Sequence, residues 1–556
     1  MYVGDKGRIN VSSSIFTNFI EKGSLYVDKT AFIEHVLQDE SDVLLFTRPR
    51  RMGKSLNMNT LATFLDCKQD TAHLFKGLYI ENSEEFGEVN KYPVVYLDFV
   101  NLNSLDFNGL RKSFRKQMLL IIEYLLDINK LNLPLREYIN DSTDYSPDIL
   151  GILLKAIAER YDKEPILIVD EYDKIIMDTL NHSESDKIKA FIVNALQSAL
   201  KGETYFEKAV LTGVTRTTKE SLFSPLNNLE VYDILNQSKY DADFSLTEAE
   251  LLELIPADEH VTHVNGSSHA IHANQLDGVR KWYNNMRVGK ELLYNIYSVM
   301  NYLSKPNAGL KGYWTMTGGG NLLSSLLNDT RTDVILRMLN DEQYRHNTKL
   351  DYQLNMEHLK DVTRCSYVSF YTIAVQAGYL SFELVETEGF MVFIPNEEAK
   401  RVWARMLLDA QYNGIDNKLY TIFTGISNVD EFSEQLTDFT SMALSFHDFQ
   451  ARAEWVYHVF FLGLAYSLNY ECKSNLEAGL GRFDIMMKSR RFGAILEFKV
   501  AKDETDGALQ AQADEAIKQI DEKEYWHELR NSPLPVYKIG IACCGKKCLV
   551  KTVVHM

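Results

Sequence analysis

Short apolar runs alternate with longer segments of helical spacing through residues 1–245. An uninterrupted apolar run fits a strand of a parallel sheet, because such a strand is covered on both faces. The expected strands are 43–46, 91–100, 166–169 and 209–216, and the expected helices are 56–65, 108–128, 147–161 and 187–202. This alternation predicts a doubly wound parallel sheet that ends near residue 245.

Residues 246–435 lose that alternation. Ser245 and Thr247 precede acidic residues and an apolar helical pattern, which is typical of a helix start. We expect a helical lid or winged-helix-like region over 246–330. A mainly helical connector should follow over 331–435, with a strand pair within 378–396.

A polar stretch inside this middle region carries four histidines, at His260, His263, His269 and His272. Histidine clusters can bind metal, but no ordered helical or strand pattern accompanies these four. A solvated loop is therefore favoured over a metal site.

The last part of the chain, 436–556, has the pattern of a separate α/β unit. Residues 480–499 predict two strands joined by a basic turn that runs from Lys488 to Arg491. Apolar helical spacing predicts one helix upstream, over 451–468, and one downstream, over 507–526.

Composition narrows the class of protein. The chain has 556 residues, 45% of them hydrophobic and 24% charged, as in ordinary globular proteins with several cores. No run of about 18 apolar residues predicts a membrane span. The first residues lack the apolar core of a secretory signal, and the six cysteines are sparse, so reduced thiols in a cytoplasm are expected. The cluster of Cys543, Cys544 and Cys548 lacks a second ligand pair for a metal.

The net charge of −18 argues against broad, nonspecific coating of nucleic acid. A local basic groove remains compatible with it.

The turn after the first strand carries the clearest chemical signal. Residues 43–55 read VLLFTRPRRMGKS, so Gly53, Lys54 and Ser55 lie between a buried strand and a helix. This is the context of a phosphate-binding loop. The backbone from Arg51 through Met52 to Gly53 would cradle phosphates. Lys54 would reach the β- and γ-phosphates of a nucleotide, and the Ser55 hydroxyl would hold Mg²⁺.

That loop departs from the general pattern at one position. G-x-x-x-x-G-K-[ST] would place a glycine where this chain has Arg48. A basic turn before a surface helix is the alternative interpretation of this segment taken alone.

A second segment favours the nucleotide interpretation. Residues 166–174 read ILIVDEYDK, an apolar strand that ends in Asp170 and Glu171. Ligands bind at the carboxyl edge of open α/β sheets, where these acids should lie. Asp170 is placed to hold Mg²⁺, and Glu171 is placed to orient the attacking water. A strand that merely ends in solvated acids is the alternative.

The strand at 209–216 ends in Thr212, Thr215 and Arg216. One of these residues could sense the γ-phosphate, and Arg216 could stabilise charge in the transition state.

A second constellation lies near the C-terminus. Glu497 and Lys499 are two residues apart, so both should point to one face of a strand, and Asp484 on the neighbouring strand could face them. Two carboxylates beside a lysine could hold a divalent metal and position a nucleophile for phosphodiester hydrolysis. Glu454 upstream could add a third carboxylate, and Gln519 or Tyr525 could assist from downstream. A surface Glu–Lys pair on a hairpin is the alternative.

Together these segments resemble bacterial proteins that join an AAA-ATPase-like domain to a C-terminal PD-(D/E)XK nuclease-superfamily domain. The residues that carry the resemblance are 25–33, 45–66, 166–174, 210–229, 479–485 and 495–500. The resemblance implies an α/β fold: a P-loop NTPase sheet, a helical middle region and a restriction-endonuclease-like C-terminal domain. Arg48 in place of the first loop glycine is similar to what that family shows.

The resemblance also implies roles for individual residues. Lys54, Ser55, Asp170 and Glu171 would belong to the nucleotide site. The nuclease core would comprise Asp484, Glu497 and Lys499, with Glu454 and Gln519 as accessory residues.

Two functions follow as hypotheses. The first is an ATP-dependent or ATP-gated nuclease that uses Mg²⁺ or Mn²⁺ on nucleic acid, with DNA as the expected substrate and defence against foreign DNA as a role suggested by the architecture. The second is a regulatory, signal-transducing ATPase whose C-terminal domain binds without cleaving. A nucleotide bound only as a structural ligand is disfavoured by Glu171. A homo-oligomer is left open.

Overall fold

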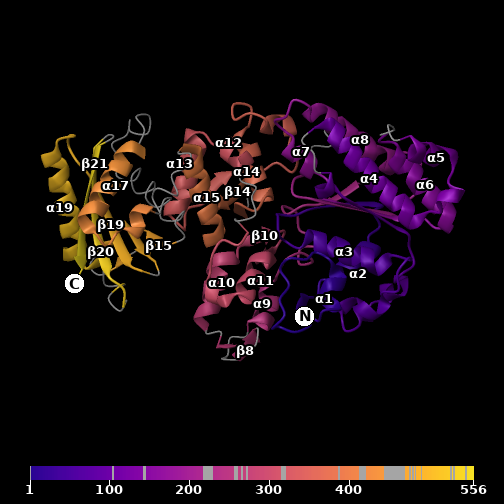
Figure 1. The fold of residues 1–556 in the computed structure, drawn as a ribbon, viewed down its shortest axis with the longest axis horizontal. Helices are drawn as coiled ribbons and strands as arrows, with labels where there is room; N and C mark the ends of the chain where they lie inside the picture. Colours follow the sequence, from indigo (N-terminus) through magenta and orange to yellow (C-terminus); the bar gives the residue numbers. More distant parts are fainter. Residues whose placement is uncertain are drawn as a thin grey trace. The chain divides into compact units, whose positions relative to one another are not determined.

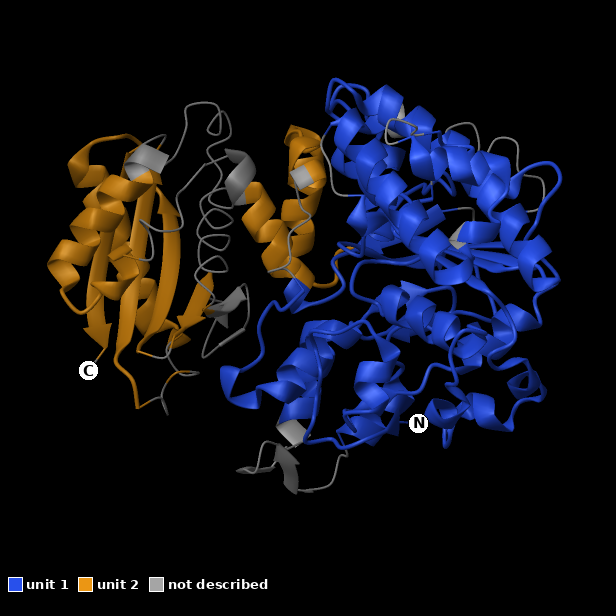
Figure 2. Ribbon diagram, turned by 45° about the vertical axis from the view of Figure 1, so that its right-hand side comes forward, with its two compact units in different colours: residues 1–317, 346–398 blue, residues 318–345, 399–556 orange. Residues whose placement is uncertain are grey.

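The computed structural model describes most of the chain. The described residues are 2–102, 106–141, 146–216, 229–255, 261–264, 267–270, 273–314, 321–385, 389–411, 421–443, 470–474, 477–478, 481–482, 484–489, 491–525, 529, 533–544 and 547–555. They form two compact units (Figure 2). Unit 1 comprises 1–317 and 346–398, and unit 2 comprises 318–345 and 399–556.

A five-stranded parallel sheet organises unit 1, as the apolar runs predict. Its strands are β3 (Val43–Thr47), β4 (Val94–Asp98), β5 (Ile166–Asp170), β6 (Lys208–Gly213) and β7 (Leu229–Tyr232), in the order β4-β5-β6-β3-β7. All four pairings are parallel. Every residue of β3, β5 and β6 is buried, which explains their continuous apolar character.

Helices cover both faces of this sheet (Figure 1). On one side lie α1 (Phe16–Ile20), α2 (Ala31–Leu37) and α3 (Lys54–Leu65); on the other lie α4 (Phe107–Leu125), α6 (Ile149–Tyr161) and α8 (Ser185–Leu200), with α5 (Leu133–Asn140) and α7 (Lys174–Asp178) nearby. Met58, Leu61 and Phe64 of α3 pack on alternate residues of the central strands. The doubly wound arrangement is therefore confirmed.

The rest of unit 1 is more irregular. Its helices are α9 (Glu248–Leu254), α10 (Ala273–Tyr283), α11 (Ile296–Ser304) and α14 (Tyr367–Gln376). Its short strands are β1 (Tyr2–Val3), β2 (Tyr26–Val27), β10 (Met286–Val288), β11 (Glu291–Leu293), β12 (His346–Thr348), β13 (Ser381–Val385) and β14 (Gly389–Phe393). The capping box at Thr247 and Glu250 starts α9, as the acidic residues after Thr247 predict.

One expectation for this region is wrong. The stretch around the four histidines, expected to be a loop, contains two antiparallel strands, β8 (Val261–Val264) and β9 (Ser267–Ala270). The Asn265–Gly266 dipeptide between them is a strong hairpin signal, which an emphasis on the histidines overlooked.

Unit 2 is built on a mixed sheet of five strands. They are β15 (Glu471–Ser474), β18 (Ile485–Lys488), β19 (Gly493–Val500), β20 (Val536–Cys544) and β21 (Lys547–His555), in that order, and only β19 and β20 run parallel. The helices α17 (Val429–Ala443) and α19 (Asp506–Glu522) lie on opposite faces of the sheet (Figure 1). Unit 2 also holds α12 (Asn321–Ser325), α13 (Asp329–Asn340), most of α15 (Glu397–Gln411) and the short pair β16 (Glu477–Ala478) and β17 (Gly481–Arg482).

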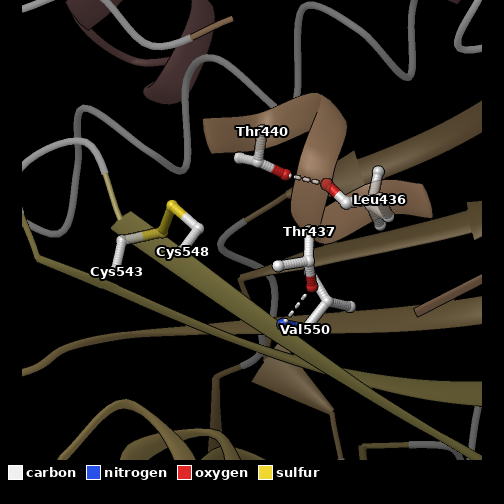
Figure 3. Close-up of a disulfide and its surroundings, with 6 residues drawn as sticks. All are labelled: Leu436, Thr437, Thr440, Cys543, Cys548 and Val550. Carbon is white, nitrogen blue, oxygen red and sulfur yellow. Dashed lines mark hydrogen bonds between the residues drawn. A yellow bond between two sulfur atoms is a disulfide. The ribbon is translucent and has the colours of Figure 1, made fainter. Parts of the chain in front are cut away.

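Cys543 and Cys548 form a disulfide between β20 and β21, next to the face that α17 covers (Figure 3). The two residues are paired in the register of the hairpin, so the fold itself brings the thiols together. The expectation of reduced thiols is wrong for this pair in the structure. Thr437 of α17 accepts a hydrogen bond from the Val550 amide and fixes the helix to β21. None of the described helices combines the length and apolarity that a bilayer crossing needs.

Candidate functional sites

The loop between β3 and α3 is shaped to receive an anion. Gly53 and Arg51 both have left-handed backbones, with φ of 87° and 64°, which turn the chain sharply into the helix. The Lys54 side chain is only 3% exposed, and its ammonium group donates to the carbonyl oxygens of Arg48 and Pro49 at 3.1 and 3.2 Å. The loop thus folds around the lysine at the helix N-terminus, a ready site for phosphate.

Arg48, which stands in place of the expected glycine, is fully buried. Its guanidinium donates to the carbonyl oxygens of Thr47 and Tyr232 at 3.0 and 2.7 Å and lies over the Phe244 ring. Burial lowers the pKa of Arg48 to about 10, while acidic neighbours such as Asp241 oppose the shift. Arg48 therefore ties the loop to β7 and does not face a ligand.

The side chains of two further loop residues, Arg51 and Met52, are packed against the protein. The Arg51 guanidinium stacks over Tyr297 at 4.6 Å from the ring centroid, and Met52 is fully buried. Either residue could serve a phosphate through its backbone N–H.

Asp170 ends β5 beside this loop. Its carboxylate accepts a hydrogen bond from the Thr212 hydroxyl, and the Tyr96 hydroxyl lies 3.4 Å away. Burial raises the pKa of Asp170, while the nearby hydroxyl groups of Ser55 and Thr212 lower it. Ser55 and Asp170, predicted from separate motifs, therefore lie near one another, and their oxygen atoms match the ligands that Mg²⁺ prefers.

Glu171 follows with a left-handed backbone, φ 55°, which is costly for a residue with a side chain. The turn directs its carboxylate toward Lys54, with 3.4 Å between Oε1 and Nζ. The left-handed backbone at this position places an acid directly beside Lys54.

Strand β6 ends at Gly213, three residues before the expected end, and the strand and the residues just after it supply further polar contacts. Thr212 bonds Asp170, whereas Thr215 donates to the buried Asp173, which also accepts from the Thr215 amide at 2.7 Å. Burial raises the pKa of Asp173, and the charge of Glu171 adds to the shift. Sequence reasoning missed Asp173, although it lies only two residues after Glu171 in the quoted motif.

Arg216 lies just beyond β6 and pairs with Asp233, at 2.6 Å between Nη1 and Oδ2. Its side chain is 16% exposed. For Arg216 to contact a γ-phosphate, its ion pair with Asp233 would have to open, or its guanidinium would have to bind both groups.

The candidate site of unit 2 lies on the α19 face of the sheet. Glu497 and Lys499 of β19 point to the same side, as the strand period predicts, and Lys499 Nζ lies 3.3 Å from Glu497 Oε1. Glu497 is 2% exposed, and its Oε1 also accepts from the Gln519 amide of α19. Gln519 in turn lies 3.3 Å from the hydroxyl of the buried Tyr525.

Asp484 lies one residue before β18, across from the end of β19. Its Oδ2 accepts a hydrogen bond from the Phe498 amide at 2.8 Å, so the side chain reaches over to the neighbouring strand. The structure therefore brings Asp484 to the stretch of β19 that carries Glu497 and Lys499. Glu454 and its expected helix, 451–468, lie outside the described residues.

The glycine at 540 permits the close approach of α19. A Cβ there would lie 2.5 Å from the Ala513 carbonyl oxygen and 3.1 Å from the Ala516 Cβ. Gly540 is paired with Glu497 across β20 and β19. Its missing side chain lets α19 pack near the sheet, so that Gln519 can reach Glu497.

These residues could hold one divalent cation between Asp484 and Glu497. In the described part of the chain, no group of three or more histidine, cysteine or acidic side chains is arranged so that it could hold a metal ion. Two carboxylates fit the hard-cation preference of Mg²⁺, which keeps several waters when bound.

Comparison with known proteins matches a part of each unit to a family. Residues 10–223 match a family described as a predicted AAA-ATPase, and residues 452–553 match the PD-(D/E)XK nuclease superfamily. A protein from Azotobacter chroococcum mcd 1, described as uncharacterised and lying in the vnfD 5′ region, is 25% identical over 541 residues. The match covers 93% of this chain and 92% of the relative.

Proposed function

Since the chain carries an AAA-ATPase-like domain and a PD-(D/E)XK nuclease-superfamily domain, we propose that it is an ATP-gated, metal-dependent nuclease. The observation that carries the proposal is the pairing of two separate sites in one chain. Lys54, Ser55, Asp170 and Glu171 converge in unit 1, and Asp484, Glu497 and Lys499 converge in unit 2. DNA is the proposed substrate, and defence against foreign DNA fits this design.

In the nucleotide site, Lys54 would exchange its carbonyl partners for the β- and γ-phosphate oxygens. The Arg51–Gly53 backbone would add N–H donors at the start of α3. Ser55 and Asp170 would hold Mg²⁺, with Thr212 fixing the Asp170 carboxylate through its hydroxyl. Glu171 would orient the attacking water and take its proton.

In the second site, Asp484 and Glu497 would hold the divalent cation. Such a cation supplies charge neutralisation at the scissile phosphate and makes bound water more acidic. Lys499 would orient the water that attacks phosphorus and stabilise the developing negative charge. Gln519 would keep the Glu497 carboxylate in place, as partners of ligand side chains commonly do.

The test is a cleavage assay on linear DNA, circular DNA and RNA, with Mg²⁺ or Mn²⁺, and with or without ATP. Lys499→Ala should lose cleavage and keep ATP hydrolysis, while Lys54→Ala should lose ATP hydrolysis and alter cleavage. Lys502, an exposed lysine just after β19, provides the matched control for Lys499.

Cleavage that persists undiminished in Lys499→Ala would overturn the assignment of this site. If no substrate is cut while ATP hydrolysis is intact, the chain is a regulatory ATPase with a binding-only C-terminal domain.

A further inference from the structure

The segment 346–398, called the return segment here, has an unusual place in the chain. It belongs to unit 1, whereas the residues before it (318–345) and after it (399–556) belong to unit 2 (Figure 2). Its last two residues begin α15, and that helix continues into unit 2 as far as Gln411. The return segment is therefore joined covalently to unit 2 at both ends.

The return segment holds the backbone of Arg216 from two sides. The Leu354 amide donates to the Arg216 carbonyl oxygen at 2.9 Å, and the Arg216 amide donates to Gln376 Oε1 at 3.2 Å. Arg216 directly follows Thr215, whose hydroxyl group bonds Asp173 beside the nucleotide site. The segment consequently fixes the chain where it leaves β6 at the ligand edge of the sheet.

Gln376 is the last residue of α14 and only 2% exposed. Its Oε1 accepts the hydrogen bond from the Arg216 amide, but its Nε2 has no hydrogen-bond partner among the residues that the structure describes. A buried amide donor without a partner is destabilising, so a side chain without one would be favoured if stability alone decided.

The same segment touches the phosphate-binding loop. Gly378 follows α14 with φ of 84°, and a Cβ at this residue would lie 2.9 Å from the Pro49 Cβ. Pro49 is also the residue whose carbonyl oxygen accepts from Lys54. One short stretch of the return segment, Gln376–Gly378, thus contacts both the loop that surrounds Lys54 and Arg216, which lies just beyond β6.

The far end of the segment is anchored as well. Glu398 is 2% exposed, and its Oε1 accepts from the Ser298 hydroxyl at 3.0 Å and from the Trp314 amide at 2.7 Å. The first turn of α15 is therefore fixed to unit 1 before the helix continues into unit 2. The segment is tethered where it meets the nucleotide site and where it leaves unit 1.

We propose that Gln376 is a positioning residue for Arg216, and that the return segment couples the nucleotide state of unit 1 to unit 2. Filling the phosphate loop displaces Pro49 and Arg216 together, and Gln376–Gly378 carries that displacement into α14 and α15. The inference rests on the proposed ATP site. It extends the proposed function by naming the element through which ATP would gate the second site.

Two matched pairs of variants test the proposal in the full-length protein. Gln376→Met removes the acceptor at similar volume, and Thr372→Val is its control. Thr372 lies on the same helix, is equally buried and accepts from the Asp351 amide at 2.8 Å, away from the loop. Gly378→Ala adds a methyl group against Pro49, and Gly309→Ala is its control, with a similar φ of 73° and nothing within 4 Å of the added atom.

The first readout is hydrogen exchange of residues 346–411 with and without a non-hydrolysable ATP analogue and Mg²⁺. Wild type, Thr372→Val and Gly309→Ala should show slower exchange on binding. Gln376→Met and Gly378→Ala should lose that response while the affinity for the analogue stays within about threefold. The factor by which the analogue slows exchange should fall fivefold or more in these two variants. This is the lower end of typical allosteric effects, which are about 5- to 150-fold.

The second readout is the ratio of cleavage rates with and without ATP, together with kcat and KM for ATP hydrolysis. Gln376→Met should lower kcat about tenfold with little change in KM, because it displaces Arg216 without removing a ground-state contact. Thr372→Val should leave the ratio and kcat unchanged. An equal response in both variants would assign Gln376 a purely structural role and overturn the proposal.

Failure of the proposed function is distinguishable from failure of this inference. If wild type cuts no substrate but the exchange of 346–411 still responds to the analogue and is lost in Gln376→Met, the coupling stands and the nuclease assignment falls. If 346–411 do not respond in wild type that binds the analogue, the coupling is overturned whatever the cleavage assay gives.

Discussion

The two candidate sites place similar side chains on a sheet in different ways. In unit 1 the polar groups lie at the carboxyl ends of parallel strands, where Asp170, Thr212 and the loop after β3 meet at one edge. In unit 2 the groups lie along a strand, with Glu497 and Lys499 on one face and Asp484 crossing from the neighbouring strand. Parallel strand ends gather residues from distant motifs, whereas a hairpin gathers residues from one short stretch.

This difference affects how each site is held. Asp170 ends β5 and accepts from Thr212 of the paired strand β6, so strand pairing positions it, whereas Asp173 accepts from Thr215, two residues beyond β6. Glu497 depends on Gln519, which arrives on a helix packed against the sheet. The first site should therefore tolerate changes in helix packing, and the second should not.

The largest effect is expected from Glu171→Gln. Loss of a general base typically costs 10²- to 10⁴-fold, so ATP turnover should fall at least about a hundredfold while nucleotide binding persists. Binding and steady-state hydrolysis would be measured in parallel. Glu164→Gln, an exposed glutamate shortly before β5, is the control and should behave as wild type. Undiminished turnover in Glu171→Gln would remove this residue from the chemistry.

Gln519→Leu tests the helix-dependent site. Loss of a residue that orients a metal ligand typically costs about 10- to 100-fold, and DNA cleavage should fall by that factor with a raised requirement for Mg²⁺. ATP hydrolysis by unit 1 should be unaffected. Gln510→Leu on the same helix removes an exposed contact with Asp514 and is the matched control. Equal loss in both variants would point to α19 stability instead.

Gly540→Ala probes the packing that the second site requires. Crowding against the Ala513 carbonyl should destabilise unit 2 by about 1–3 kcal/mol, measured by denaturant unfolding. Gly507→Ala, in the first turn of α19 with nothing within 4 Å, should instead leave stability unchanged or slightly raised. A neutral Gly540→Ala would mean that α19 shifts without cost, and the contrast between the two sites would weaken.

Asp170→Asn should produce the smallest effect on stability, and it should raise stability where Gly540→Ala lowers it. The pKa of Asp170 is raised in the folded protein, so the ionised carboxylate disfavours folding above its folded pKa. The penalty is absent below the unfolded pKa, near 3.8, and grows as the pH rises toward the folded value. The variant should therefore be slightly more stable than wild type at pH 7, with the advantage shrinking toward pH 4.

Unfolding at several pH values would measure this difference, with the exposed Asp70→Asn as the control. The same Asp170→Asn protein should lose Mg²⁺-dependent ATP hydrolysis. A variant less stable than wild type at pH 7 would show that the nearby Ser55 and Thr212 hydroxyl groups outweigh burial.

The sequence predicts strong, buried elements well. The central strands β3 and β5 lie where their apolar runs predict, whereas β6 ends at Gly213, three residues before the expected end of that strand. The strand β7 was missed because its residues are only partly buried and its apolar character is weak. The β18–β19 hairpin was predicted from two alternating or apolar runs joined by a basic turn, and most residues of both strands are buried.

Contacts that depend on tertiary packing could not be predicted. The proximity of Ser55 and Asp170 was foreseen because both ends follow known motifs, but Arg48 and Asp173 have partners far along the chain or on another strand. The Cys543–Cys548 disulfide depends on hairpin register, which the clustered cysteines alone do not specify.

Arg48 also restricts the conformational freedom of the loop between β3 and α3. A glycine there would leave the turn free to sample many shapes, whereas the buried guanidinium fastens it to Thr47 and Tyr232 during folding. The conformational entropy of the loop is then lost once, when the protein folds, and not again at each binding event. The shape of the proposed nucleotide loop is accordingly linked to the integrity of β7, through the Tyr232 carbonyl oxygen at the end of that strand.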